Sequence, residues 1–445
     1  MKKRILIEDV LVVPMTSSVE PYYRASVGIE ENKIVLICRS GEQARLFKSD
    51  ETAEVKVIDG RGRVLMPGLI NIHTHASMTL LRGYADDYEL MDWLNNYIWP
   101  FEAKLQAEDY RSGARLAVAE MLTGGTTSML DMYFNEDLIA HEVVAGGMRA
   151  WLGTSFLRSP HEKYCEELDR VGELLKKSEY SNIKSVVAPH APYTVSDENL
   201  KWTHSEAARR SLLLHIHLAE TLDEQKIIAE KCGMTPVEYC HKLGILDKNT
   251  IAAHCVHLSQ SDMDIMAECG VSVAHNPQSN MKLASGIAPV AQMLKSGINV
   301  GLGTDGASSN NDLDMWEEMR SASLLAKVST GDPCALPAYE ALKMATVNGA
   351  VALGVDDKLG TIAEGMIADL ILVDLQKSHL QPMHNLISTL VYATKSSDVD
   401  TVIVDGKIVV ENGVLTRIDI DQVIADARKS VGAIIQRMNA DKDSK

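Results

Sequence analysis

The chain lacks any apolar run long enough to cross a membrane. A membrane-spanning helix needs about 20 consecutive apolar residues, and no stretch of the 445 residues approaches that length. The opening MKKRILIEDVLVV starts with basic residues, but Glu8 and Asp9 interrupt its apolar run. A secretory signal needs about 7–15 uninterrupted apolar residues, so this opening predicts a strand rather than a signal peptide.

Cysteine is scarce and carries no pairing pattern. The seven cysteines are odd in number and scattered, and they include no C-x-x-C pair. That pattern is typical of reduced thiols and indicates a cytoplasmic protein rather than a disulfide framework. The zinc-site fold of the cytidine deaminases is excluded as well. It requires H-x-E and P-C-x-x-C, whereas DPCALP at residues 332–337 lacks the second cysteine.

Basic residues are outnumbered by acidic ones. There are 44 Lys and Arg against 61 Asp and Glu, which gives a net charge of −17. Such a chain repels a phosphate backbone or an anionic lipid surface on average. We therefore expect neither a nucleic-acid polymer nor a membrane as partner, while a small neutral or zwitterionic ligand stays open. The 46% hydrophobic and 24% charged fractions are typical of a soluble globular protein.

Both ends of the chain alternate short β-rich runs with turn signals. In residues 1–65 and 359–418, turns such as VDGK and ENG separate apolar runs, and Gly and Asn tolerate the positive φ of hairpin turns. The two ends are predicted to pair into one small β-sandwich domain, which would bring the chain termini close together. Residues 419–445 are predicted to form a C-terminal surface helix, over 419–440, and a tail.

The remaining residues, 66–358, alternate apolar strands with helical stretches. Stretches such as 103–123 and 224–243 carry apolar residues at i, i+3 and i+4 spacing. Candidate strands cover residues 69–75, 126–131, 149–154, 185–190, 212–218, 251–254, 271–275 and 298–303. Eight β/α units in about 250 residues predict an α/β fold of the (β/α)8 TIM-barrel class. A doubly wound open sheet is the alternative that periodicity leaves open.

The first predicted barrel strand, LINIHTHAS, ends with two histidines. Side chains at i and i+2 of a strand face the same side, so His73 and His75 point together. Two buried imidazoles without a shared ligand are unfavourable, and a metal ion between them removes the conflict. A coincidence of the core or the surface is the other interpretation.

Further candidate ligands follow later strands. LLLHIHLAE ends the fifth strand with His215 and His217 on one face, and Asp305 follows the eighth strand in VGLGTDGASSN. Barrel strands deliver their C-terminal residues to one mouth, where catalytic sites assemble. His73, His75, His217 and Asp305 therefore form a nitrogen and oxygen ligand set that suits zinc or a similar divalent ion.

The segments PGLINIHTHAS, HLAET, AHCVHL and GTDGASSNNDLDMWEEMR resemble the amidohydrolase superfamily and, within it, the 5-methylthioadenosine/S-adenosylhomocysteine deaminase family. The resemblance covers nearly the whole chain. It implies that the four ligands hold one divalent ion, with Zn²⁺ expected and Fe²⁺ or Mn²⁺ also compatible with the set. Some amidohydrolases bridge two ions with a carboxylated lysine that ends the fourth strand. Here that strand ends at His190 and Lys184 lies at its other end, so a mononuclear site is expected.

The resemblance also implies an activity, the hydrolytic deamination of adenine nucleosides to ammonia and the inosine analogue. A bound divalent ion lowers the pKa of water to about 7 and so supplies hydroxide at neutral pH. Glu220, three residues after His217, resembles the family's proton shuttle, and a carboxylic acid suits general acid–base catalysis. Asp305 would accept the proton of the water, and His254 would orient the hydroxide. A salt-bridged loop carboxylate is the other interpretation of Glu220.

Residues 81–105, after the first barrel strand, are expected to cover the barrel mouth. Within them Trp93 and Glu102 match family positions that contact the nucleoside, Glu102 at the ribose hydroxyls. A helix-packing role is the alternative for Trp93. His190 matches a substrate-contacting histidine, and Ser309 a residue beside the ligand. The predicted substrate-binding residues are Trp93, Glu102, His190, Glu220, Asp305 and Ser309.

One position departs from the family pattern. Thr154, in WLGTSFLRSP, stands where family members often carry an arginine that meets the ribose or an amino-acid tail. Arg158 is close enough in sequence to substitute for it. Whether S-adenosylhomocysteine is accepted therefore stays open. The resemblance further implies a small-molecule substrate and a homo-oligomer, either a dimer or a tetramer.

Other functions compete with adenine nucleoside deamination. A guanine or pterin deaminase or an s-triazine hydrolase would use the same metal site, although Glu102 favours a ribose-bearing ligand. A metal-binding protein without turnover would need neither Glu220 nor His254. GLGTDG, residues 301–306, matches G-x-G-x-x-G, but a dinucleotide fingerprint opens a helix in an early βαβ unit. This match is late and contains Asp305, so no dinucleotide site is predicted.

Overall fold

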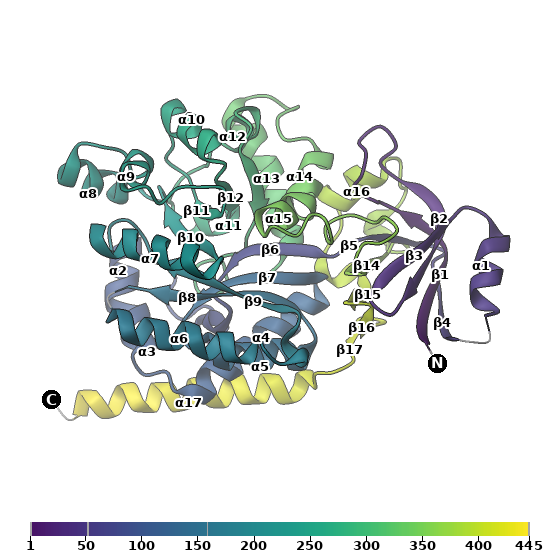
Figure 1. The fold of residues 1–445 in the computed structure, drawn as a ribbon, viewed down its shortest axis with the longest axis horizontal. Coiled ribbons are helices and arrows are strands. Elements are labelled where there is room, and N and C mark those ends of the chain that lie inside the picture. Colours follow the sequence, from purple (N-terminus) through teal and green to yellow (C-terminus); the bar gives the residue numbers. More distant parts are fainter. Residues whose placement is uncertain (1, 51–52, 158, 444–445) are drawn as a thin grey trace.

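The computed structural model describes residues 2–50, 53–157 and 159–443, and Figure 1 shows two sheets side by side. Eight parallel strands form the barrel sheet, in the order β13 to β6. The predicted α/β class and (β/α)8 barrel are confirmed. The barrel strands are β6 (Leu69–Thr74), β7 (Thr126–Tyr133), β8 (Arg149–Phe156), β9 (Ile183–Pro189), β10 (Leu213–Leu218), β11 (Thr250–His254), β12 (Ser272–His275) and β13 (Asn299–Leu302).

The barrel closes where its first strand meets its last. Strands β6, β7 and β8 are buried along their whole length, as expected for a parallel sheet covered on both faces. Thr74, at the end of β6, forms a parallel bridge with Asp305, just after β13. The backbone N–H of Asp305 also donates to the carbonyl of His73 at 3.0 Å. Closure therefore joins the C-terminal ends of β6 and β13, which carry predicted metal ligands.

The second sheet combines both ends of the chain, as predicted, in a mixed sheet of nine strands. Antiparallel pairing of β5 with β14 joins the two ends. The predicted boundaries at residues 65, 359 and 418 stay predictions. The strands of this composite sheet are β1 (Lys2–Val12), β2 (Tyr23–Glu30), β3 (Lys33–Cys38), β4 (Ala53–Asp59), β5 (Arg63–Pro67), β14 (Leu370–Asp374), β15 (Val399–Val404), β16 (Lys407–Glu411) and β17 (Val414–Leu415).

Helices cover the barrel. One of them occupies residues 107–123 of the predicted helical stretch 103–123. The predicted stretch 224–243 instead forms two helices, because Gly233 has a left-handed φ of +71° and Pro236 starts a new helix. The α-helices are α1 (Gly41–Lys48), α2 (Leu90–Trp93), α3 (Trp99–Glu102), α4 (Ala107–Thr123), α5 (Glu136–Gly146), α6 (His161–Leu174), α7 (Asp197–Arg210), α8 (Leu222–Cys232), α9 (Pro236–Leu243), α10 (Gln260–Cys269), α11 (Pro277–Lys282), α12 (Val290–Lys295), α13 (Met315–Thr330), α14 (Ala338–Met344), α15 (Val347–Ala352), α16 (Leu386–Tyr392) and α17 (Ile420–Asp443). A π-helical turn, Leu94–Ile98, joins α2 to α3.

The chain termini do not lie close together, contrary to the expectation from the split domain. Helix α17 leaves the composite sheet and runs along the barrel, so its end and the start of β1 lie on opposite sides of the molecule in Figure 1.

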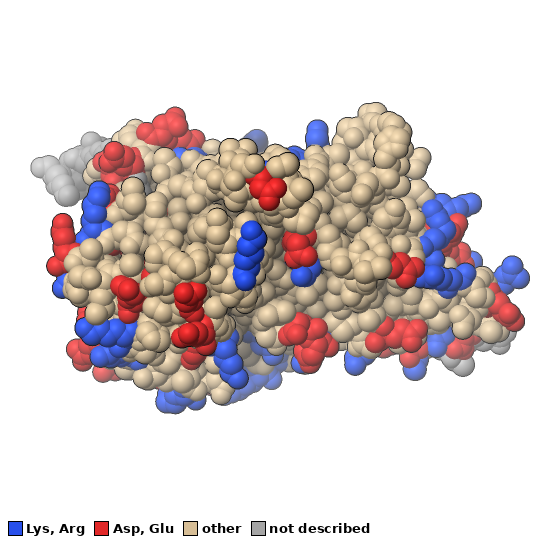
Figure 2. Space-filling view, turned by 90° about the horizontal axis from the view of Figure 1, so that it is seen from above, with Lys and Arg blue, Asp and Glu red and all other residues tan. Residues whose placement is uncertain are grey.

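Among the described residues, none of the helices combines the length and apolar character that a bilayer span requires. Figure 2 shows one face on which acidic and basic side chains are interspersed.

A buried ion pair fastens the barrel to the composite sheet. Arg149, the first residue of β8, donates through Nε and Nη2 to the two carboxylate oxygens of Asp369, at 2.9 and 3.1 Å. Asp369 precedes β14 and also accepts the backbone N–H of Asp405 at 2.8 Å. The Arg149 and Asp369 side chains are only 9% and 5% exposed. A buried charge that loses its partner is strongly destabilising.

Replacing Asp369 with alanine should therefore lower the free energy of unfolding by about 3–5 kcal/mol, because the Arg149 guanidinium loses its bidentate partner. Urea denaturation followed by fluorescence measures the change. As a control, Glu173→Gln breaks the exposed pair with Lys176 and should cost at most about 1 kcal/mol. Equal effects of the two substitutions would contradict the proposed importance of the pair.

Candidate active site

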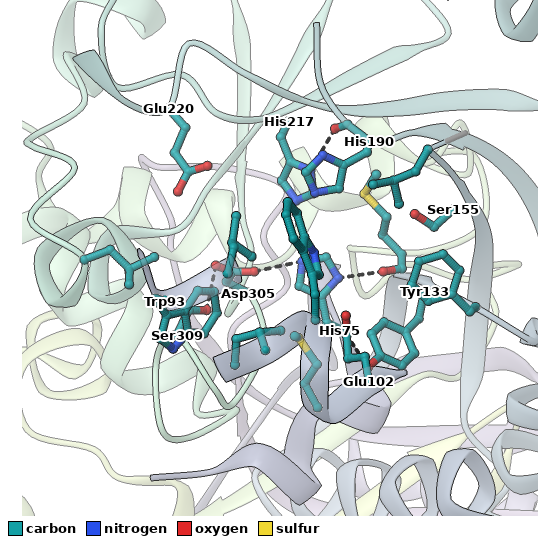
Figure 3. Close-up of a pocket in the computed structure, with 18 of the residues that line it drawn as sticks. His75, Trp93, Glu102, Tyr133, Ser155, His190, His217, Glu220, Asp305 and Ser309 are labelled. Atoms are coloured by element: carbon teal, nitrogen blue, oxygen red, sulfur yellow. Dashed lines mark hydrogen bonds and ion pairs between the residues drawn. The ribbon is translucent and has the colours of Figure 1, made fainter. Parts of the chain in front are cut away.

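The C-terminal ends of the barrel strands surround a cavity, at the mouth where barrel enzymes assemble their active sites. Figure 3 shows the side chains that line it, drawn from strands around the barrel and from the segment after β6. His73 is fully buried and lies behind the cavity wall, where its ring contacts Asp305, which does line the cavity. Of the site residues predicted from the sequence, nine line the cavity: His75, Trp93, Glu102, His190, His217, Glu220, His254, Asp305 and Ser309.

The four predicted metal ligands lie together. The Nε2 atoms of His73 and His75 are 3.3 and 3.1 Å from Oδ1 of Asp305. Two overlapping groups, His73–His217–His254 and His73–His75–Asp305, each keep their potential ligand atoms within 4.8 Å of one another. Segments separated by more than 200 residues thus bring together groups that could hold a metal ion, and His73 belongs to both.

Hydrogen bonds to the outer ring nitrogens orient two of these histidines. Nδ1 of His75 pairs with the carbonyl of Met132 at 2.6 Å, and Nδ1 of His217 pairs with the carbonyl of His190 at 2.8 Å. A carbonyl can only accept, so Nδ1 carries the hydrogen in both rings. Nε2 is therefore the nitrogen that each ring offers to a cation, which is the usual arrangement in metal sites.

His73 is oriented by another histidine. Nδ1 of His215 donates to the carbonyl of Ile251 at 3.0 Å, so Nε2 of His215 carries a lone pair. That atom lies 2.7 Å from Nδ1 of His73 and accepts its hydrogen. Among the residues that the structure describes, Nε2 of His73 then has no hydrogen-bond partner, although it is buried. Buried polar atoms are nearly always satisfied, and a divalent cation is the partner that this donor set fits.

The charges of the cluster are strongly coupled. Burial lowers the pKa of His73 to about 4. Burial also lowers the pKa of His75, but its contacts with Asp305 outweigh burial and raise it to about 9. Burial raises the pKa of Asp305, yet the two histidines lower it well below its usual range. Ser279 and Ser309 donate to Oδ2 of Asp305 at 2.6 and 2.7 Å, which leaves Oδ1 facing the histidines.

Glu220 and His254 lie beside this cluster. Oε2 of Glu220 is 4.0 Å from Nε2 of His254, and Nδ1 of His254 pairs with Oδ1 of Asn280 at 2.9 Å. Burial raises the pKa of Glu220, which favours the protonated form that a general acid needs. Glu224, in the first turn of α8, accepts the backbone N–H groups of Ala219 and Glu220 at 3.0 and 2.8 Å. The Glu224 carboxylate therefore fixes the backbone on which Glu220 stands.

Unusual backbone conformations sit where the strands reach the mouth. Ala219, His254 and Asp305 have φ values of 53°, 72° and 58°, a left-handed region that non-glycine residues seldom adopt. A Cβ added to Gly303 would lie 2.7 Å from the Cβ of His73. Gly303, the second glycine of GLGTDG, thus allows the chain after β13 to approach β6 closely. This close approach gives the glycine a structural role that needs no bound dinucleotide.

The segment after β6 closes one side of the cavity. Trp93 is buried and its Nε1 donates to the carbonyl of Ala85 at 2.9 Å. Glu102, at the end of α3, accepts the Tyr133 hydroxyl at 2.5 Å, and burial of its carboxyl raises its pKa to about 7. Burial lowers the pKa of His190 to about 4, so this ring is neutral.

Comparison with known proteins gives the family. Residues 64–409 match the amidohydrolase family. A 5-methylthioadenosine/S-adenosylhomocysteine deaminase of Pelotomaculum thermopropionicum is 47% identical over 97% of this chain and 99% of the relative. A 5'-deoxyadenosine deaminase of Methanosarcina barkeri is 45% identical, covering 98% and 99% of the two chains. The structure of an adenosine deaminase from Xanthomonas campestris with bound zinc superposes with a TM-score of 0.91 at 36% identity, covering 97% and 98%.

The chain belongs to the amidohydrolase family. Lys184 of this amidohydrolase is exposed near the start of β9, away from the ligand cluster at the opposite end of the barrel strands.

Several cavity residues were not predicted from the sequence. Tyr133 is the last residue of β7 and Ser155 the second-last residue of β8, and both line the cavity. Their position at the C-terminal ends of barrel strands was the available signal. Thr154 is buried and does not line the cavity, because adjacent strand residues face opposite sides and Ser155 takes the inward position. Arg158 lies outside the described residues.

Replacing His215 with phenylalanine should weaken metal binding by about 10–100-fold, because the acceptor that fixes the His73 tautomer is lost. Competition with a chelator, followed by metal analysis of the protein, measures the affinity. His141→Phe is the matched control, since His141 lies on α5 and pairs with Tyr180 outside the cavity. Unchanged metal retention in the His215 variant would exclude this role of the histidine relay.

Proposed function

We propose that this amidohydrolase is a metal-dependent deaminase that hydrolyses adenine nucleosides to ammonia and the corresponding inosine analogues. The observation that carries the proposal is the shared cavity, in which a buried acid, Glu220, lies beside the cluster of histidines and Asp305. Relatives at 45–47% identity, named as deaminases of 5-methylthioadenosine and S-adenosylhomocysteine or of 5'-deoxyadenosine, support it.

The metal site is assigned to His73, His75, His217 and Asp305, with one divalent ion. Zinc is the expected ion, since the structurally similar adenosine deaminase contains it. When bound, the ion supplies hydroxide at neutral pH by lowering the pKa of water. The orphaned Nε2 of His73 supports this assignment.

The side chains around this site divide the proton transfers. Asp305, held by two serine hydroxyls on Oδ2, accepts the proton of the attacking water on the side of the histidines. Glu220 is protonated more readily than an exposed carboxyl because burial raises its pKa. It donates to the ring nitrogen and then carries a proton to the departing amino group. His254, whose Nε2 faces Glu220, orients the water.

The remaining cavity residues bind the substrate. Trp93 and neighbouring apolar side chains exclude water from the ring, and neutral His190 borders it. Glu102 lies away from Glu220 in the cavity (Figure 3) and accepts hydrogen bonds from the sugar hydroxyls. A free guanine, pterin or triazine would leave this carboxylate without donors, so Glu102 favours a nucleoside over these ring substrates.

Assembly and location stay predictions. The family resemblance implies a dimer or a tetramer. A cytoplasmic location rests on cysteines that are all free in the structure.

Replacing Glu220 with glutamine should lower kcat for ammonia release by at least about 100-fold, because the amide cannot cycle a proton, while metal content stays unchanged. Ammonia release is assayed with adenosine, methylthioadenosine, S-adenosylhomocysteine, guanine and triazines. Glu230→Gln, at an exposed position of α8, is the control. Full turnover in the Glu220 variant would remove its catalytic role, and preference of the wild-type protein for a free base would overturn the substrate class.

The pH dependence of substrate binding should reveal Glu102. Its pKa of about 7 means that the carboxylate, the form that accepts from the sugar hydroxyls, is lost as the pH falls below 7. KM for adenosine should therefore fall as the pH rises from about 6 to about 8. Glu102→Gln should abolish that part of the profile, whereas Glu108→Gln, at an exposed position of α4, should keep it. A pH-independent KM in the wild-type protein would contradict this role.

A further inference from the structure

A hydrogen-bonded pair of polar side chains occupies the cavity wall away from Glu220. Tyr133 ends β7 and Glu102 ends α3, so two distant segments supply the pair. The Tyr133 hydroxyl donates to Oε1 of Glu102 at 2.5 Å, and within the described residues neither side chain makes a further hydrogen bond. Both residues line the cavity, and Tyr133 is only 3% exposed. The contact therefore joins two groups that face the same ligand space.

The two groups offer acceptors and no free donor. A phenol has one hydrogen, and that of Tyr133 is used on Glu102, which leaves the phenol oxygen as an acceptor. The carboxylate keeps Oε2 and part of Oε1 as acceptors. Because one short hydrogen bond links them, the acceptors lie about as far apart as the oxygens of two neighbouring hydroxyl groups. Such a pair matches a ligand that presents two adjacent O–H donors.

The surroundings make this match selective. Phe134, Leu94 and Ile98 contribute apolar wall to the same cavity, so a ligand without the donors would leave the acceptors buried and unpaired. Leaving buried acceptors unpaired costs more binding free energy than a matched hydrogen bond contributes. This part of the cavity should therefore bind a ligand that lacks one of the hydroxyls more weakly than a ligand that carries both.

We propose that Tyr133 and Glu102 act together as the recognition element for the vicinal hydroxyls of the nucleoside sugar, each accepting from one hydroxyl, so that Tyr133 is a specificity residue. This inference rests on the proposed deaminase function. It assigns to Tyr133 both a direct contact with the sugar and the orientation of Glu102.

The test compares adenosine, 2'-deoxyadenosine, 3'-deoxyadenosine and 2',3'-dideoxyadenosine as substrates of the wild-type, Tyr133→Phe and Glu102→Gln proteins, at equal metal content. Tyr133→Phe should lower kcat/KM about tenfold or more for adenosine while changing that for the dideoxy nucleoside less than about twofold. The penalty for removing one of the two hydroxyls should disappear in this variant, and the penalty for the other should persist. If turnover of the dideoxy nucleoside is too slow to follow, its inhibition constant gives the same comparison.

Tyr180→Phe is the matched control, because its hydroxyl bonds to Nδ1 of His141 at 2.6 Å outside the cavity. It should keep the wild-type order of the four nucleosides. An equal loss in the Tyr133 variant for all four, including the dideoxy nucleoside, would show a merely structural role and overturn the inference. Absence of ammonia from every nucleoside with the wild-type protein would instead overturn the proposed function itself.

Discussion

The structure depends on bringing several histidine rings and one carboxylate together at the end of a closed barrel. In a place with little water these polar groups lose their hydration, so the arrangement is unfavourable unless a cation satisfies them. Hydrogen bonds on the outer ring nitrogens prevent the rings from relieving the conflict by turning over. The His215 relay is the clearest case, because it leaves the buried Nε2 of His73 with nothing else to bind.

Several features of the scaffold serve this convergence. Pairing between β6 and the residue after β13 brings His73 and Asp305 together through a backbone hydrogen bond. Gly303 permits the close approach of β13 to β6. Residues with left-handed backbone conformation, such as His254 and Asp305, turn the chain at the mouth of the barrel. The packing of the barrel holds these residues in their strained backbone conformation, as at many functional sites. The Arg149–Asp369 pair then fastens the barrel to the composite sheet at the opposite, N-terminal end of β8.

In the proposed mechanism, reaction and recognition occupy different sides of the cavity. Glu220, His254 and Asp305 would move the protons, whereas Glu102 and Tyr133 form a hydrogen-bonded polar pair beside apolar side chains. Water exclusion strengthens hydrogen bonds and charges on both sides, since screening is weak in such a cavity. The same exclusion makes an unmatched polar group costly. One cavity can therefore support catalysis and selectivity with few side chains.

Much of this could be predicted from the sequence because it follows from local rules. The two-residue spacing of His73 and His75 determined that they share a face, and runs of apolar residues determined the eight strands, whose ends carry His217 and Asp305. The motifs around them determined the family.

Tyr133 and Ser279 were missed because a tyrosine or serine at a strand or helix end is common. The break at Gly233 was missed because the apolar spacing continues across it. Only the tertiary structure decided which ring nitrogens of His73, His75 and His217 face the cluster, that Ser155 rather than Thr154 reaches the cavity, and that Tyr133 contacts Glu102. These contacts join residues far apart in the chain, and they depend on strand register, loop path and hydrogen-bond direction, none of which leaves a periodic pattern in the sequence.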